Sequence, residues 1–152
     1  MVSKKGELVL AIRLNYQEAA IRVCIDQVKD QLICGRIVSQ RLTVPICFHD
    51  INDLVIKIDS LMEAQAFPQA FNSMRSFTKR TLRDLPAAQS EEELSTIEEV
   101  YAHTRDIITF ALLVTSRRNS SWQGYIDWLD DSPKQPFSSA LEFIKLVIHK
   151  AT

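Results

Sequence analysis

Hydrophobic and polar residues alternate along two neighbouring stretches near the C-terminus. The first stretch runs from Ile108 to Arg118 and the second from Ser121 to Trp128. A period of two predicts antiparallel strands that each bury one face. The positions expected on that buried face are Phe110, Leu112, Val114, Trp122, Ile126 and Trp128.

The next segment predicts a short strand and a closing helix. Pro133 ends the second strand, because proline cannot donate a hydrogen bond to a sheet, and the short strand is expected to end at Phe137. Ser139 and Glu142 have capping-box spacing, which predicts that a helix begins there. The apolar stripe of this helix is Ala140, Phe143, Ile144 and Val147.

The same pattern occurs 89 positions earlier, without a gap from about Ala20 to Met62. Corresponding positions include Phe110 and Ile21, Gly124 and Gly35, Phe137 and Phe48, Ser139 and Asp50, and Glu142 and Asp53. Because the glycine, the phenylalanine and the cap stay in register, we expect two related units. Chance alternation of apolar residues is the competing explanation.

The rest of the chain predicts one more strand and two more helices. Leu8 to Tyr16 alternates like a strand, and Gln69 to Leu85 fits a helical stripe after the break at Phe67-Pro68. Ser90 and Glu93 again have capping-box spacing, which predicts a third helix ending near Arg105. These two helices would form a hairpin.

The expected fold is α+β, with two related antiparallel β-meander-plus-helix units joined by a helical hairpin. The 152 residues suit a single compact domain, 1–152. Within it, the first sheet-helix unit is 8–66, the helical hairpin 67–106 and the second unit 107–152. The hydrophobic fraction of 46% and the charged fraction of 24% are typical of globular proteins.

Charge, hydropathy and cysteines favour a cytoplasmic protein. A formal net charge of −1 gives no overall attraction to nucleic acid or to a membrane. No apolar run approaches the roughly 18 residues of a spanning helix, and the start at Met1 is unlike a signal peptide. Cys24, Cys34 and Cys47 form no CxxC pair, so we expect free thiols in a reducing compartment.

One stretch of the second unit resembles a known group of proteins. Ser121-Trp122-Gln123-Gly124, Trp128 and the run from Phe137 to Ile144 are similar to a motif of short, uncharacterised bacterial proteins, often from Gram-positive bacteria. The resemblance covers about a fifth of the chain. It implies a bacterial or mobile-element origin, and brings no activity, substrate or partner with it.

The sequence contains no catalytic, cofactor or metal signature. His49, His103 and His149 lack the HxxxH or HExxH spacing of a metal site. Cys47 and His49 would share one face of a short strand, so a thiolate pair is one hypothesis. A cysteine in the core or at a sheet edge is the favoured interpretation. We therefore expect no enzyme, no cofactor and no metal.

A basic set lies on the predicted second helix. Arg75, Lys79 and Arg83 recur every four residues on one helical face, with Arg80 beside them. This set could bind an anion or nucleic acid, and Arg117 and Arg118 at the second hairpin tip would extend it if the fold brings them close. A solvated helix face is the alternative interpretation, because acidic residues of the third helix could neutralise these charges.

The outer face of the predicted sheet is unusually apolar. It would carry Cys24, Leu32, Cys34 and Val38 in the first unit, and Ala111, Leu113, Tyr125 and Leu129 in the second. A face of this kind is normally covered. The helical hairpin could cover one unit, and a protein partner or a second copy of the chain the other, with Leu113, Tyr125 and Leu129 as contact residues.

The function expected from this reasoning is protein binding. We expect a non-enzymatic regulator or inhibitor of bacterial, phage or mobile-element origin, including an anti-defence role. The alternatives are nucleic-acid binding through the basic helix and a cysteine-dependent enzyme.

Overall fold

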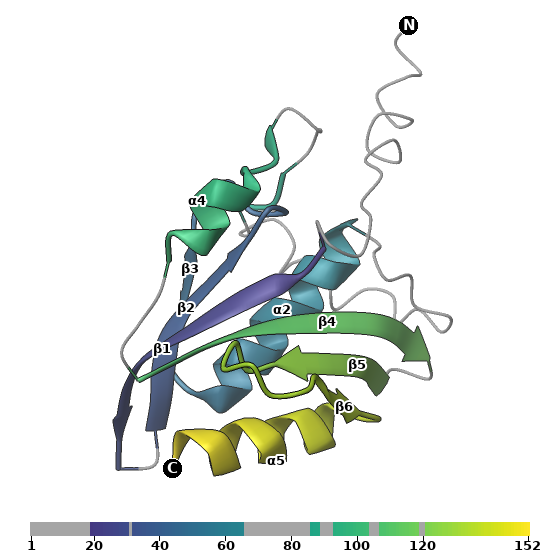
Figure 1. Ribbon diagram of the computed structural model, residues 1–152. Helices are drawn as coiled ribbons and strands as arrows, with labels where there is room; N and C mark the ends of the chain where they lie inside the picture. Colours follow the sequence, from purple (N-terminus) through teal and green to yellow (C-terminus); the bar gives the residue numbers. More distant parts are fainter. Residues whose placement is uncertain (1–18, 31, 66–85, 89–92, 104–106, 119–120) are drawn as a thin grey trace, which may run out of the picture.

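The computed structural model describes residues 19–30, 32–65, 86–88, 93–103, 107–118 and 121–152. Within these residues one antiparallel sheet has the strand order β3-β2-β1-β4-β5-β6 (Figure 1). The strands are β1 (Ile21–Lys29), β2 (Leu32–Ser39), β3 (Ile46–Phe48), β4 (Ile108–Arg118), β5 (Ser121–Asp127) and β6 (Gln135–Phe137). The helices are α2 (Ile51–Gln65), α4 (Ile97–Tyr101) and α5 (Ala140–Ala151). The expected α+β class is confirmed.

The two hairpins of the sheet have matching registers. Ile25 lies opposite Gly35 in the first hairpin, and Val114 lies opposite Gly124 in the second. In both hairpins the register shifts just after this pair. A side chain at either glycine would overlap the backbone carbonyl of the facing strand, so this close approach requires glycine.

The hairpins meet in the middle of the sheet through β1 and β4. The pairing runs from Ile21 opposite Leu112 to Ile25 opposite Ile108, so Val23 and Phe110 form its middle pair. The two hairpins therefore extend outward from a common centre in opposite directions.

Both edges of the sheet end in a strand of three residues. Phe48 of β3 pairs with Gly35, and Phe137 of β6 pairs with Gly124. On β3, the Cys47 carbonyl accepts a 2.8 Å hydrogen bond from the Lys57 ammonium group. On β6, Pro136 has no N–H to offer. Short edges with a proline or a lysine resist pairing with another chain.

Helices α2 and α5 start with the predicted caps. The Asp53 N–H donates to the Asp50 side chain at 2.7 Å, and the Glu142 N–H donates to the Ser139 hydroxyl at 3.0 Å. Each acidic side chain also reaches back across the cap, since Asp53 accepts from the His49 N–H and Glu142 from the Ser138 N–H. These bonds satisfy N–H groups that a helix start leaves unpaired.

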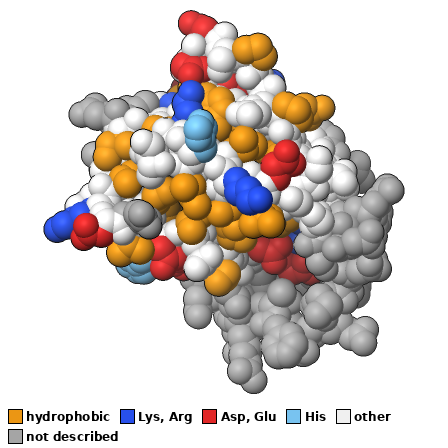
Figure 2. Space-filling view, turned by 90° about the horizontal axis from the view of Figure 1, so that it is seen from below, with side chains coloured by type: hydrophobic (Ala, Val, Ile, Leu, Met, Phe, Trp, Pro, Cys, Tyr) orange, Lys and Arg blue, Asp and Glu red, His pale blue; other side chains and the backbone are white. Residues whose placement is uncertain are grey.

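The hydrophobic core lies between one face of the sheet and the helices α2 and α5. Every residue predicted for the buried face of β4 and β5 is buried. Phe143 of α5 is fully buried, with its ring 5.5 Å from Trp122, 5.6 Å from Phe137 and 6.3 Å from Phe110 between centroids. Burial of one such side chain stabilises the fold by roughly 1.5–3 kcal/mol. Helix α5 lies at the bottom of the view in Figure 1, so it is on the side that faces the viewer in Figure 2, which shows the molecule from below.

The predicted third helix begins later than expected. Its N-cap is Thr96, which forms a capping box with Glu99, and the helix α4 covers only Ile97–Tyr101. The prediction of a helical Leu94 is wrong, because the next residue, Ser95, donates its N–H to the Gln40 carbonyl and its hydroxyl to the Leu42 carbonyl. The strand predicted from Leu8 to Tyr16 and the helix from Gln69 to Leu85 lie outside the described residues.

Candidate functional site

The chain's own α4 segment covers part of the outer face of the first hairpin, around Arg22, Cys24 and Arg36, whereas Leu32 at the far end is 58% exposed. Val100 of α4 is buried. Beyond the helix, the His103 carbonyl accepts a 2.8 Å bond from the Arg22 side chain and a 3.6 Å contact from the Cys24 thiol. The His103 ring nitrogen Nδ1 lies 2.9 Å from the Arg36 guanidinium. Two arginines of the sheet therefore hold the end of this segment.

Packing under the α4 segment changes the chemistry of Cys24. The Cys24 side chain is fully buried. Desolvation raises the pKa of its thiol, and this outweighs a hydrogen bond from Thr109 and the charges of Arg36 and Arg22, which act in the opposite direction. Cys24 is therefore a protonated structural thiol at neutral pH.

The outer face of the second hairpin is more open. Tyr125 is 44% exposed, Leu129 is 45% exposed and Leu113 is partly buried. Tyr101 of α4, which is 58% exposed, stands over the neighbouring part of the sheet, because the Arg22 guanidinium lies 5.4 Å from its ring centroid. Leu113, Tyr125 and Leu129 all line hollows on this face, as the sequence predicted for the outer sheet face.

Two adjoining hollows form a groove between α4 and the strands β4 and β5. Each has a volume of about 390 Å³, and both are lined by Ala20, Tyr101, Ala111 and Asp127. Leu113, Tyr125 and Lys134 complete one hollow, whereas Ile97, Val100 and Leu129 belong to the other. We call this combined surface the outer groove. The sequence did not reveal Ile97 and Tyr101 as its wall, since their place depends on contacts with distant strands.

Leu129 is held in the outer groove by an unusual backbone conformation. Its φ angle is +60°, a left-handed value that costs a residue with a branched side chain roughly 1–2 kcal/mol. The Leu129 N–H donates a 3.0 Å hydrogen bond to the Asp127 carboxylate, which stabilises this turn. The fold therefore maintains backbone strain at a position where a large apolar side chain stays exposed.

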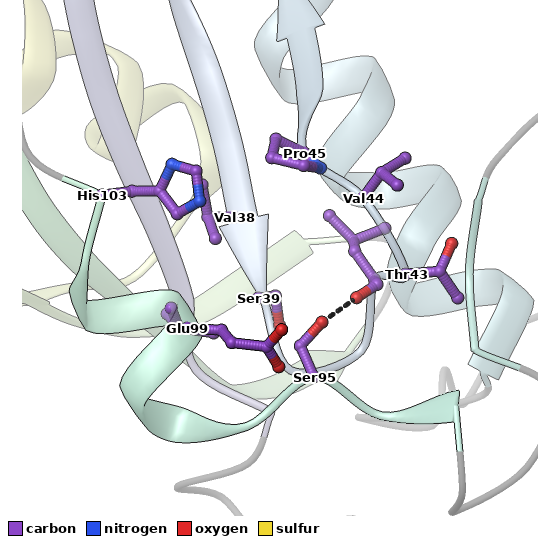
Figure 3. Close-up of a pocket in the computed structure, with 10 residues that line it drawn as sticks. Val38, Ser39, Thr43, Val44, Pro45, Ser95, Glu99 and His103 are labelled. Atoms are coloured by element: carbon purple, nitrogen blue, oxygen red, sulfur yellow. Dashed lines mark hydrogen bonds between the residues drawn. The ribbon is translucent and has the colours of Figure 1, made fainter.

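A smaller pocket near α4 contains residue types found in hydrolases. It has a volume of about 90 Å³, and Ser95, Glu99 and His103 point toward it (Figure 3). The Ser95 hydroxyl donates to the Leu42 carbonyl at 2.6 Å, and the Glu99 carboxylate accepts from the Thr96 N–H at 2.8 Å. The Thr96 hydrogen bonds also lower the pKa of Glu99. The bonds of these side chains thus hold the α4 segment in place.

Cys47 and His49 lie at one edge of the sheet, and both are exposed. Within the described part of the chain, no hydrogen bond joins the Cys47 thiol to the His49 ring. The backbone of the same segment anchors α2, through the bonds to Lys57 and Asp53. The structure thus adds no support for a thiolate pair.

The predicted basic set, Arg75, Lys79, Arg80 and Arg83, lies outside the described residues. Arg117 is not a surface extension of it, because its side chain is only 4% exposed and pairs with Glu63 at 3.1 Å and Asp59 at 3.8 Å. The pKa of Arg41 is lowered to about 9, mainly because burial removes its side chain from water and also because the positive charge of Arg117 is close. The sequence did not reveal these two buried arginines, because neither sits in a recognisable motif.

Three further findings concern ligands, membranes and relatives. Among the described residues, no three His, Cys, Asp or Glu side chains gather as metal ligands would. None of the helices described is both long enough and apolar enough to cross a bilayer. Comparison with protein-family models, with curated proteins and with solved structures found no match for this chain.

Proposed function

We propose that this chain acts by binding another protein through the outer groove. The observation that carries the proposal is the grouping of Tyr101, Tyr125 and Leu129, each about half exposed, around one concave surface. Tyrosines are frequent at protein interfaces, because the ring supplies apolar contact area while the hydroxyl stays hydrated. The strained turn at Leu129 adds to this support, since strain of this kind gathers at binding sites.

We also propose that the two hairpins with their closing helices are related units. The matching registers, the two obligate glycines and the two side-chain caps at corresponding positions support this relation. Under this correspondence Ala111 takes the place of Arg22, Leu113 of Cys24 and Tyr125 of Arg36. In the first unit these positions contact the α4 segment. A partner protein would then occupy the equivalent position over the second unit.

The role that we propose for this binding is regulation or inhibition of a larger assembly in the cytoplasm. A small domain with one apolar groove can block or position a partner without altering it chemically. The resemblance of residues 121–144 to short bacterial proteins is the support for a bacterial, phage or mobile-element setting.

The test compares partners recovered by the unmodified chain and by groove variants. Tyr125→Glu and Leu129→Glu place a carboxylate in the groove, and Val44→Glu changes a side chain of similar exposure elsewhere, at 55%. Affinity capture with mass spectrometry should show partners that both groove variants lose and that Val44→Glu retains. Equal recovery by all four proteins, with near-ultraviolet circular dichroism confirming their folds, would show that the groove is not the binding surface.

A further inference from the structure

One of the two hollows in the outer groove, the one that Leu129 lines, contains one positive and one negative side chain. Its volume of about 390 Å³ lies near the lower end of the roughly 300–1,000 Å³ that is typical of ligand pockets. Arg22 and Asp127 are its charged lining residues, whereas Lys134 lines only the adjoining hollow. Both charged side chains are half-buried. We call this cavity the Leu129 hollow, and its two charges balance each other.

The sheet register places these two charges on either side of a small residue. Ala111 of β4 pairs with Arg22 of β1 and with Asp127 of β5, so the three side chains form one row across the outer face. Because Ala111 carries only a methyl group, the space between the two longer side chains stays open. A ligand lying over Ala111 would therefore meet a guanidinium group on one side and a carboxylate on the other.

Neither charge is paired with an opposite charge in the described part of the chain. Arg22 donates from Nε to the His103 carbonyl at 2.8 Å and lies 5.4 Å from the Tyr101 ring centroid, which together fix its position. Its terminal nitrogens make no hydrogen bond or ion pair with the described residues. Asp127 accepts a 3.0 Å bond from the Leu129 N–H and forms no ion pair with those residues. A ligand that carries both charges would offset the partial loss of hydration of both groups.

The rest of the Leu129 hollow is mostly apolar. Helix α4 contributes Ile97, Val100 and Tyr101 to its wall, and Leu129 closes it from the other side. The left-handed turn described above holds Leu129 in this place. Two fixed charges beside an apolar wall are the features expected of a site for a small ligand that has two opposite charges and an apolar body.

We propose that the Leu129 hollow binds a free amino acid with an apolar side chain. The α-carboxylate pairs with Arg22, the α-ammonium group pairs with Asp127, and the apolar side chain contacts Ile97 and Leu129. This binding needs no partner protein, because every lining residue belongs to this chain, so the inference goes beyond the protein binding proposed above. We expect a dissociation constant on the order of 0.1–1 mM, since so small a ligand makes few contacts.

Titration of the nitrogen-15-labelled chain with leucine, followed by NMR, tests the proposal. Leucine should shift the amide signals of Tyr101, Ala111 and Asp127. Leucinamide lacks the carboxylate and N-acetyl-leucine lacks the ammonium charge, so each should bind at least about tenfold more weakly. Glycine keeps both charges but lacks the apolar side chain, and it should also bind more weakly. The absence of shifts with about 20 mM leucine, or an affinity for any of these three compounds equal to that for leucine, would overturn the proposal.

Asp127→Asn separates the charge of this residue from its structural role. The asparagine oxygen can still accept the hydrogen bond from the Leu129 N–H, so the turn is retained while the charge is lost. This variant should bind leucine at least about fivefold more weakly. Asp131→Asn makes the same change at an exposed position that does not line the hollow, and it is the matched control. Leucinamide tests the role of Arg22 in place of a substitution, because changing Arg22 would also release His103. Unchanged leucine affinity in Asp127→Asn, or an equal loss in Asp131→Asn, would contradict the assigned site, and near-ultraviolet circular dichroism verifies that both variants fold.

Discussion

The close approach of two strands at Gly124 makes a single methyl group costly. In Gly124→Ala the new carbon would overlap the Leu113 carbonyl oxygen, and its next neighbours are the Leu113 carbonyl carbon and the Val114 Cα. All three atoms belong to the backbone of β4, so no side-chain rotation can relieve the overlap. The strands must separate at the register shift, where the pairing is already irregular.

The expected cost of Gly124→Ala is about 2 kcal/mol in the free energy of unfolding. Overpacking costs roughly 1–3 kcal/mol, and a clash with backbone belongs near the upper end. Loss of the flexible glycine from the unfolded chain returns roughly 0.4–1 kcal/mol. Because Gly35 meets the Cys24 carbonyl in the same way, Gly35→Ala should cost about as much.

Urea unfolding followed by tryptophan fluorescence measures this cost, because Trp122 and Trp128 are both buried in the second half of the sheet. Gln123→Ala, at the exposed neighbouring position of β5, is the control and should change stability by less than about 0.5 kcal/mol. A Gly124→Ala protein as stable as this control would refute the reasoning from close approach. A large difference between the two glycine variants would contradict the correspondence between the hairpins.

Two further predictions concern buried ionisable groups. Cys24 is buried and its pKa is raised, whereas Cys47 is exposed. A thiol reagent should therefore modify Cys47 in the native protein and Cys24 only on unfolding, with mass spectrometry identifying the modified site. Similar rates of modification of Cys24 and Cys47 in the native protein would contradict this reasoning. Arg41 has a native pKa of about 9, well below the ordinary value of arginine. Between these two values the unfolded chain binds the additional proton, so this group makes the free energy of unfolding rise with pH. Relative to Arg41→Met, the unmodified chain should gain on the order of 1–2 kcal/mol between pH 8 and 10.5 in urea unfolding, whereas parallel pH curves would argue against a depressed pKa.

The parts of the fold that the sequence predicted are those fixed by neighbouring residues. Alternation with a period of two identified the strands, because one face of each strand is buried whatever its partner. The helix caps at Asp50 and Ser139 were also predicted correctly, because their hydrogen bonds join residues only three or four positions apart.

The features that the sequence did not reveal depend on contacts between distant segments. The segment before α4 stays non-helical because Ser95 bonds to Gln40 and Leu42, more than fifty residues earlier. Tyr101 becomes a wall of the outer groove only because β1 and β4 meet at the centre of the sheet. No local pattern encodes either contact, so the leucines and tyrosine of the groove were predicted without the helix that completes it.

The proposed relation between the two units also explains how the surfaces of the second unit differ from those of the first. On α2, Asp59 accepts a 3.3 Å hydrogen bond from the Trp122 indole and lies 3.8 Å from Arg117, so this position connects the helix to the other half of the sheet. The corresponding position on α5 is Ile148, which is 40% exposed. On the outer face, Arg22 and Arg36 hold the α4 segment, whereas Ala111 and Tyr125 take their places in the second unit. In both cases the first unit uses a polar residue for a contact within the chain, and the second unit presents an apolar one. A single pattern of substitution would therefore leave more apolar surface on the second unit, including the outer groove that we propose as the site of a partner protein.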